Sequence, residues 1–279
     1  MPGFRQSLMV LVPTLFLSAC SIFSLGLRFG DFLILRQLDR DFDLRRSQYQ
    51  RVSTQVDEHW LWFRKEGSLA VATLIDEHLH CLSDGLTVSD LGEIETKLLG
   101  MRRQVMERVA SNANTFLCDL SEQQLIHFSE RLEERNEWAK KAFDREIPPP
   151  GTLLPDLEQI QSWLGPLDET QEKLLATRLA WQRTEVEGWI GIHRRMQERL
   201  VQGIRVAKQR ESCAAFWLSL TEDPLSLYGE DRSAYETSRA KRREWTVDLV
   251  ATLTKRQQQH LVDRLKGYAK DFRSLAARP

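Results

Sequence analysis

Apolar residues recur along nearly the whole chain at the three- and four-residue spacing of an amphipathic helix. The residues between them carry charges of both signs, which is typical of helix faces in contact with water. The pattern predicts an all-α protein, built as an elongated antiparallel array of several helices. A first helix is predicted over residues 31 to 65, on a seam formed by Leu35, Leu38, Phe42, Tyr49, Val52, Val56 and Phe63.

Glycine, proline and short polar turns divide the rest of the chain. Gly67 is expected to bend the first helix before a continuation from Leu69 to Leu82. Further helices are predicted over residues 88 to 109, 122 to 145, 155 to 164, 169 to 210, 231 to 251 and 255 to 276.

The strongest break in the pattern is a run of three prolines, Pro148 to Pro150, followed by glycine. Proline lacks the backbone N–H that a helix needs, and it pushes the preceding residue toward extended geometry. We therefore predict a Pro-rich linker over residues 147–155. It would separate an N-terminal helical lobe (31–146) from a C-terminal helical lobe (156–279).

The start of the chain has the layout of an export signal. Arg5 precedes an apolar stretch, and the small residues Ser18 and Ala19 precede Cys20. This resembles the bacterial lipobox, which implies cleavage between Ala19 and Cys20 and a covalent lipid on the cysteine. Residues 1–19 would then be a signal peptide, and residues 20–30 a lipidated, membrane-proximal segment.

An uncleaved anchor is the competing interpretation, because the uncharged stretch between Arg5 and Arg28 has about the 20 residues that span a membrane. Pro13, Gly26 and several serines make that helix less favourable. Ser21 after the cysteine resembles the sorting signal for the outer membrane. The predicted location is the periplasmic face of that membrane, with the inner membrane and the cell surface left open.

Composition narrows the possible partners. Loss of Arg5 with the signal leaves 38 of the 39 basic residues against 40 acidic ones, so the net charge gives no reason to expect a nucleic-acid partner.

Beyond Cys20 the chain has three cysteines, Cys81, Cys118 and Cys213, so at most one pair can form. Cys81 with Cys118 is conceivable, but the apolar helical surroundings favour buried free thiols.

Four predicted helix starts share a pattern: a leucine, an N-cap residue, and an acceptor side chain three residues after the cap. Such a capping box satisfies backbone N–H groups that the helix leaves free. Apolar residues follow eight and twelve positions after the leucine, so capping and burial explain the repeat without any binding role. The pairs are Ser121 with Gln124, Asp168 with Gln171, Thr254 with Gln257 and, more faintly, Thr87 with Asp90.

The repeats resemble the Leu-Thr-x-x-Gln motif of the periplasmic proteins Spy and CpxP, which implies a cradle-shaped helical protein with a chaperone-like function. A longer resemblance, to an uncharacterised family of proteobacterial helical lipoproteins, implies a location and a fold but no activity. It depends on the lipobox, the capped repeats, Leu38-Asp39, Asp43-Leu44, Trp60 to Arg64 and Leu265 to Phe272. Where that family has an aromatic-His-Arg run and then Glu-Leu-Pro, this chain has Trp62-Phe63-Arg64 and Glu66-Gly67-Ser68.

Catalytic and metal-binding patterns are weak. His78 and His80 are two residues apart and point in different directions on a helix, while His59 is expected to be a partly buried, hydrogen-bonded core residue. Asp39, Asp41 and Asp43 match a fragment of a calcium loop, but its glycine and glutamate are missing, which favours a solvated helix face. No metal, no catalytic residue and no cofactor other than the lipid on Cys20 are predicted.

The sequence therefore predicts a membrane-anchored envelope lipoprotein that binds proteins without catalysing a reaction. Its partners would be the membrane, through the lipid, and envelope proteins or unfolded clients. The alternatives are a structural scaffold for assembly of an envelope complex and an enzyme with an unrecognised site.

Overall fold

The computed structural model describes residues 26–144 and 157–277, and among these it contains helices joined by short turns and no β-strand. The all-α prediction is confirmed. The signal, the cleavage site at Ala19 and Cys20 and the Pro-rich linker lie outside the described residues. In order along the chain, the elements are α2 (Gly30–Phe42), α3 (Arg46–Trp62), the π-helical turn η1 (Phe63–Gly67), α4 (Ser68–His78), α5 (Cys81–Asp84), α6 (Val88–Arg108), α7 (Ala110–Asp119), α8 (Glu122–Asp144), α9 (Leu157–Leu164), α10 (Glu169–Gln209), α11 (Cys213–Glu222), the 3-10 turn η2 (Ser226–Asp231), α12 (Arg232–Ala251) and α13 (Lys255–Ala276).

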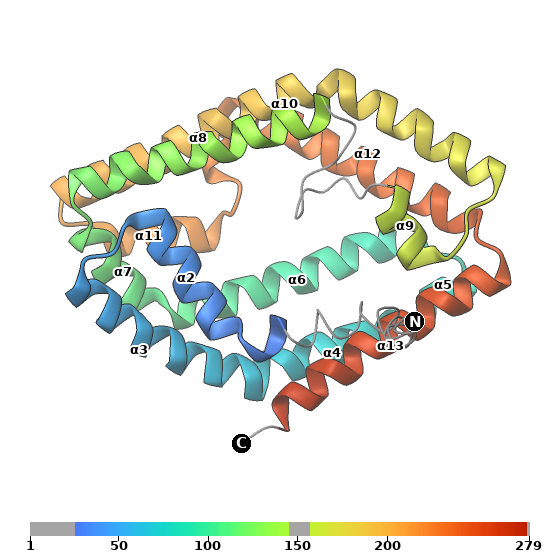
Figure 1. The fold of residues 1–279 in the computed structure, drawn as a ribbon, viewed down its shortest axis with the longest axis horizontal. Helices are drawn as coiled ribbons and strands as arrows, with labels where there is room; N and C mark the ends of the chain where they lie inside the picture. The colour runs from blue at the N-terminus through green and yellow to red at the C-terminus, as the bar shows by residue number, and fades with distance from the viewer. Residues whose placement is uncertain (1–25, 145–156, 278–279) are drawn as a thin grey trace, which may run out of the picture.

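The helices are arranged as a flattened, elongated ring (Figure 1). Along one long side α8 packs against α10, and on the opposite side α13 packs against α4. The first turns of α3 and α8 lie at one end of the long axis, and those of α10 and α13 lie at the other end. None of the helices in the described ranges is both long enough and apolar enough to cross a membrane.

The single first helix predicted over residues 31 to 65 is wrong. The chain leaves α2 at Asp43, which has a left-handed φ of 46°, and reverses before α3 begins at Arg46. Part of the predicted seam nevertheless packs together: Leu35 of α2 and Val52 and Val56 of α3 form one buried cluster, whereas the seam residue Tyr49 is exposed. Two helices that face each other thus produce the same spacing as one long helix.

The three aspartates of α2 do not form one solvated face, so that expectation is also wrong. Asp41 is buried; its carboxylate accepts a hydrogen bond from Gln37 at 2.7 Å and pairs with Arg135 of α8. Asp43 caps the C-terminus of the helix. A buried carboxylate requires such partners, so Asp41 links α2 to α8.

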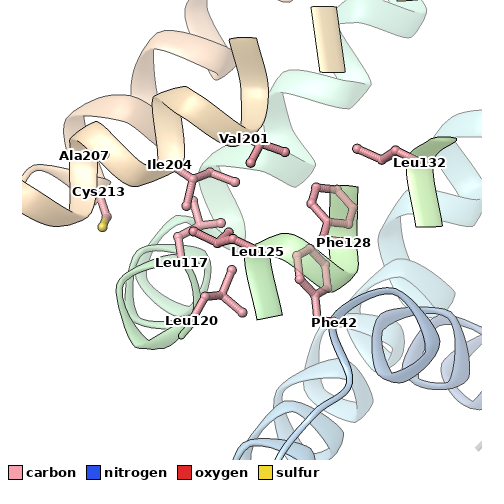
Figure 2. Close-up of a cluster of buried hydrophobic side chains, with 10 residues drawn as sticks. All are labelled: Phe42, Leu117, Leu120, Leu125, Phe128, Leu132, Val201, Ile204, Ala207 and Cys213. Atoms are coloured by element: carbon pink, nitrogen blue, oxygen red, sulfur yellow. The ribbon is translucent and has the colours of Figure 1, made fainter. Parts of the chain in front are cut away.

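The main core is shared by helices from both sides of the Pro-rich stretch. Figure 2 shows these side chains meeting between α2, α7, α8, α10 and α11. Each large apolar side chain that is fully buried stabilises the fold by about 1.5–3 kcal/mol. The cluster consists of Phe42, Leu117, Leu120, Leu125, Phe128, Leu132, Val201, Ile204, Ala207 and Cys213. A second cluster lies where α5, α9, α10 and α12 meet.

Candidate functional site

At one end of the ring the first turns of α3 and α8 are joined by two buried glutamines. The Oε1 atoms of Gln48 and Gln124 accept the backbone N–H groups of Arg45 and Ser121, both at 3.0 Å. Gln124 Nε2 donates to Gln48 Oε1 at 2.8 Å, and Gln48 Nε2 donates back to Gln124 Oε1 at 3.3 Å. We call this reciprocal pair of capping glutamines a glutamine clasp.

A second glutamine clasp joins α10 and α13 at the opposite end of the ring. Gln171 Nε2 donates to Gln257 Oε1 at 2.9 Å, and Gln257 Nε2 donates to Gln171 Oε1 at 2.8 Å. Each Oε1 again accepts the N–H of its own N-cap residue, Asp168 at 3.1 Å and Thr254 at 3.0 Å. The same geometry therefore occurs twice in one chain.

All four clasp glutamines also bind the backbone of the neighbouring segment. These bonds use the NH₂ group of each side chain to tie it to a backbone carbonyl. The Nε2 atoms donate from Gln48 to Asp119 O (3.2 Å), from Gln124 to Phe42 O (3.0 Å), from Gln171 to Thr252 O (3.1 Å) and from Gln257 to Pro166 O (2.8 Å).

The side-chain amide explains why only some of the capping boxes pair. Glutamine uses its oxygen for the cap and keeps its NH₂ group for a neighbour, whereas a carboxylate has no hydrogen to donate. Asp90 accepts the N–H of Thr87 at 2.8 Å and receives no partner glutamine. The box of α6 therefore remains a simple cap on the surface.

Gln48 of the first clasp belongs to a further copy of the capping repeat that the sequence pattern did not predict. Gln48 follows Leu44 by four positions, and Val52 and Val56 follow at the repeat's offsets of eight and twelve. The N-cap position of this copy holds Arg45, whose side chain cannot accept a hydrogen bond, whereas the four predicted copies have Ser, Thr or Asp there. The four-residue spacing between the leucine and the glutamine is the signal by which the sequence could have identified this copy.

Beside the first clasp lies a cavity of about 630 Å³, which we call the apolar chamber. Residues of α2, α3, η1 and α7 form much of its wall, together with a few residues of α6, α8, α10 and α11. Its surface is almost wholly apolar. Seven aromatic side chains line it: Phe42, Trp60, Trp62, Phe63, Phe116, Phe128 and Trp217.

His59 is one of the few polar side chains in the wall. Asn112 Nδ2 lies 2.9 Å from His59 Nε2, and since an amide nitrogen only donates, Nε2 accepts and Nδ1 carries the proton. Nδ1 is buried and has no hydrogen-bond partner among the described residues. Burial, and then the charge of Arg108, lowers the pKa of His59, so folding favours the neutral ring. The expected hydrogen-bonded, partly buried histidine is confirmed.

The lowered pKa makes stability depend on pH in a predictable direction. The folded state binds a proton at His59 less well than the unfolded chain, so stability is lost as pH falls below the ordinary histidine value of about 6.5. His59→Gln is expected to flatten this loss between pH 6.5 and 5, measured by urea unfolding. His193, whose pKa burial also lowers, is present in both proteins and cancels from the comparison. An unchanged pH slope would contradict the assignment.

The expectation that Cys81, Cys118 and Cys213 are all free thiols is wrong. Cys118 of α7 and Cys213 of α11 form a disulfide, next to the chamber residues Leu117 and Trp217. The conceivable Cys81–Cys118 pair is not formed, since Cys81 is free and buried. Burial raises the pKa of the Cys81 thiol, and a protonated, buried thiol is a poor nucleophile.

In the two described ranges no three His, Cys, Asp or Glu residues gather as metal ligands. His78 Nδ1 instead bonds the carbonyl of Leu74 at 2.9 Å. Among the described residues, the apolar chamber, flanked by one clasp and the disulfide, is the candidate binding site.

In comparisons with known proteins, the chain matches no family model, no curated protein and no solved structure. Membership of the lipoprotein family and the likeness to Spy and CpxP stay predictions.

Proposed function

We propose that this chain is a membrane-anchored protein of the bacterial envelope that binds other proteins without catalysing a reaction, in the manner of a chaperone. The apolar chamber is the single observation that carries the proposal. Its volume of about 630 Å³ lies within the 300–1,000 Å³ typical of ligand pockets. The guest would be the apolar side chains of an exported client or envelope protein.

The composition of the wall limits how a client can enter. A peptide group that loses its water must find hydrogen bonds, and the chamber offers almost no exposed polar atoms. Side chains of an amphipathic helix avoid that cost, because the helix satisfies its own backbone. We therefore favour clients that present two or three aromatic or aliphatic side chains from a helix.

The disulfide supports the proposed location. Stable disulfides form in the periplasm and other oxidising compartments and are rare in the cytoplasm. Cys118 and Cys213 thus agree with export through the signal at residues 1–19. We favour the periplasmic face of the outer membrane as the location. The proposed attachment to the membrane is a covalent lipid on Cys20.

Filling the chamber should weaken client binding while leaving the fold intact. Ala113 of α7 lines the cavity, so Ala113→Phe adds a ring to the space that the guest would occupy. We expect the variant to suppress client aggregation several-fold less well than the unmodified protein, at substoichiometric and equal ratios.

The matched control is Ala176→Phe on the exposed surface of α10, which should act like the unmodified protein. Circular dichroism melting would verify that both variants fold. Equal activity of the two variants would exclude the chamber as the client site. Absence of suppression by the unmodified protein across several clients, with one stable partner found by crosslinking, would favour the scaffold alternative instead.

The anchor has its own test. Cys20→Ala removes the thiol to which a lipid would be attached, so incorporation of a labelled fatty acid into the protein should be lost. Cys81→Ala is the control, because that thiol is buried in the fold. Labelling that persists in the Cys20 variant would refute the lipobox.

A further inference from the structure

One side of α2 exposes large apolar side chains to solvent. Phe29, just before the helix, is 47% exposed, Phe32 is 54% exposed and Leu33 is 49% exposed. The other side of the helix is occupied, since Leu35 and Phe42 are buried. Three large apolar groups within five residues are more than the scattered exposure normal for a protein surface.

Basic residues continue the same side of the helix. Positions 29, 33, 36 and 40 follow steps of four, three and four, so Arg36 and Arg40 align with Phe29 and Leu33. Both arginines are exposed. Arg36 follows Phe29 by seven positions, which is about 10 Å along the axis. We call the five residues Phe29, Phe32, Leu33, Arg36 and Arg40 the outer stripe of α2.

We infer that the outer stripe of α2 rests on the surface of the lipid bilayer. The aromatic and leucine side chains would enter the boundary between headgroups and acyl chains, where interfacial helices insert about 5–10 Å deep. The arginines, about 10 Å (Arg36) and about 16 Å (Arg40) further along the helix than Phe29, would then meet the lipid phosphates. This inference rests on the proposed anchor at Cys20.

The chain before α2 supports a bilayer as the occupant rather than a soluble partner. Phe29 follows Cys20 by nine positions, and even a fully extended chain spans only about 30 Å over that stretch, so a lipid on Cys20 keeps the stripe near the membrane. This connection is itself apolar, with Ile22, Phe23, Leu25 and Leu27 and no charge before Arg28.

A consequence for the chamber follows from the geometry of the helix. Leu38 and Phe42 line the chamber from the side of α2 that faces away from Phe29 and Leu33. A bilayer contact on the outer stripe therefore makes α2 the membrane-side wall of the chamber. The chamber would then be held directly above the membrane surface.

The test measures the depth of single labels on the full lipidated chain in vesicles. A cysteine is introduced by Leu33→Cys or, as the control, by Leu218→Cys on α11, which is 52% exposed. The buried Cys81 and the disulfide leave the new thiol as the site for a fluorescent maleimide. Vesicles of phosphatidylcholine and phosphatidylglycerol carry nitroxide-labelled lipids as quenchers.

We expect several-fold stronger quenching of the label at position 33 than at position 218. The double variant Arg36→Glu and Arg40→Glu should weaken it in vesicles that contain phosphatidylglycerol. Equal quenching at both positions, in protein that floats with the vesicles, would overturn the membrane contact of the outer stripe. Flotation of the protein would still support the lipid anchor at Cys20. A label at position 33 that is shielded from water but not quenched, with crosslinked dimers, would assign the stripe to a second copy and also overturn it.

Discussion

Replacing Gln171 by methionine is expected to lower the free energy of unfolding by about 3–5 kcal/mol, because each buried polar group left without a partner costs about 1–3 kcal/mol. Methionine keeps the length of the side chain and removes its hydrogen bonds. The N–H of Asp168, the carbonyl of Thr252 and the amide of Gln257 would each lose a partner. Urea unfolding followed by circular dichroism measures the effect.

The chain offers a matched control in the unpaired box of α6. Asp90→Ala removes a cap of the same kind with no clasp attached, and should cost only about 1 kcal/mol. The double variant Gln171→Met and Gln257→Met should be less destabilised than the sum of the two single variants, since each single change already breaks the pair. Additive losses, or a Gln171→Met loss no larger than that of Asp90→Ala, would show that the clasp adds nothing to capping.

The second large effect is expected from the disulfide. Cys118 and Cys213 are 95 residues apart, and a cross-link that closes so long a loop stabilises a fold by about 3–5 kcal/mol, mainly by restricting the unfolded chain. Cys118→Ala with Cys213→Ala should therefore lower the free energy of unfolding by that amount. Helices α7 and α11, which line the chamber, should lose protection from hydrogen exchange first.

Reductant separates the cross-link from the packing of the side chains. It should lower the urea midpoint of the unmodified protein and of Cys81→Ala, and leave the double alanine variant unchanged. Alanine is preferred to serine because Cys213 is 1% exposed and a buried hydroxyl would add its own cost. A midpoint of the unmodified protein that is insensitive to reductant would contradict the pairing.

The two clasps give the capped repeats an architectural explanation. Each holds two helix N-termini together at one end of the ring, and the first clasp includes Gln48 of α3, a helix that lines the chamber. Helix starts carry free N–H groups and a partial positive charge, so bringing two together is unfavourable unless acceptors satisfy both. The reciprocal amides satisfy both at once, which explains the glutamines without a bound ligand.

The sequence by itself determined where most helices begin and end. Capping pairs mark the starts of α6, α8, α10 and α13, and their predicted first residues match the structure. These signals are local: a cap binds N–H groups two or three residues away, and an amphipathic face shows in the spacing of its own residues. The short elements α7, α11 and η2 were not predicted, since ten residues or fewer carry little periodicity; α9 is equally short, but proline and glycine mark its ends.

Only the tertiary structure decided which parts meet. The glutamine partners are 76 and 86 residues apart, the cysteines are 95 apart, and α2 and α3 differ from one long helix only by a reversal at Asp43. Spacing along the chain cannot distinguish a capping glutamine from a paired one, because both need the same local bond. The chamber likewise exists only where side chains of several helices leave space between them, and no local pattern encodes that space.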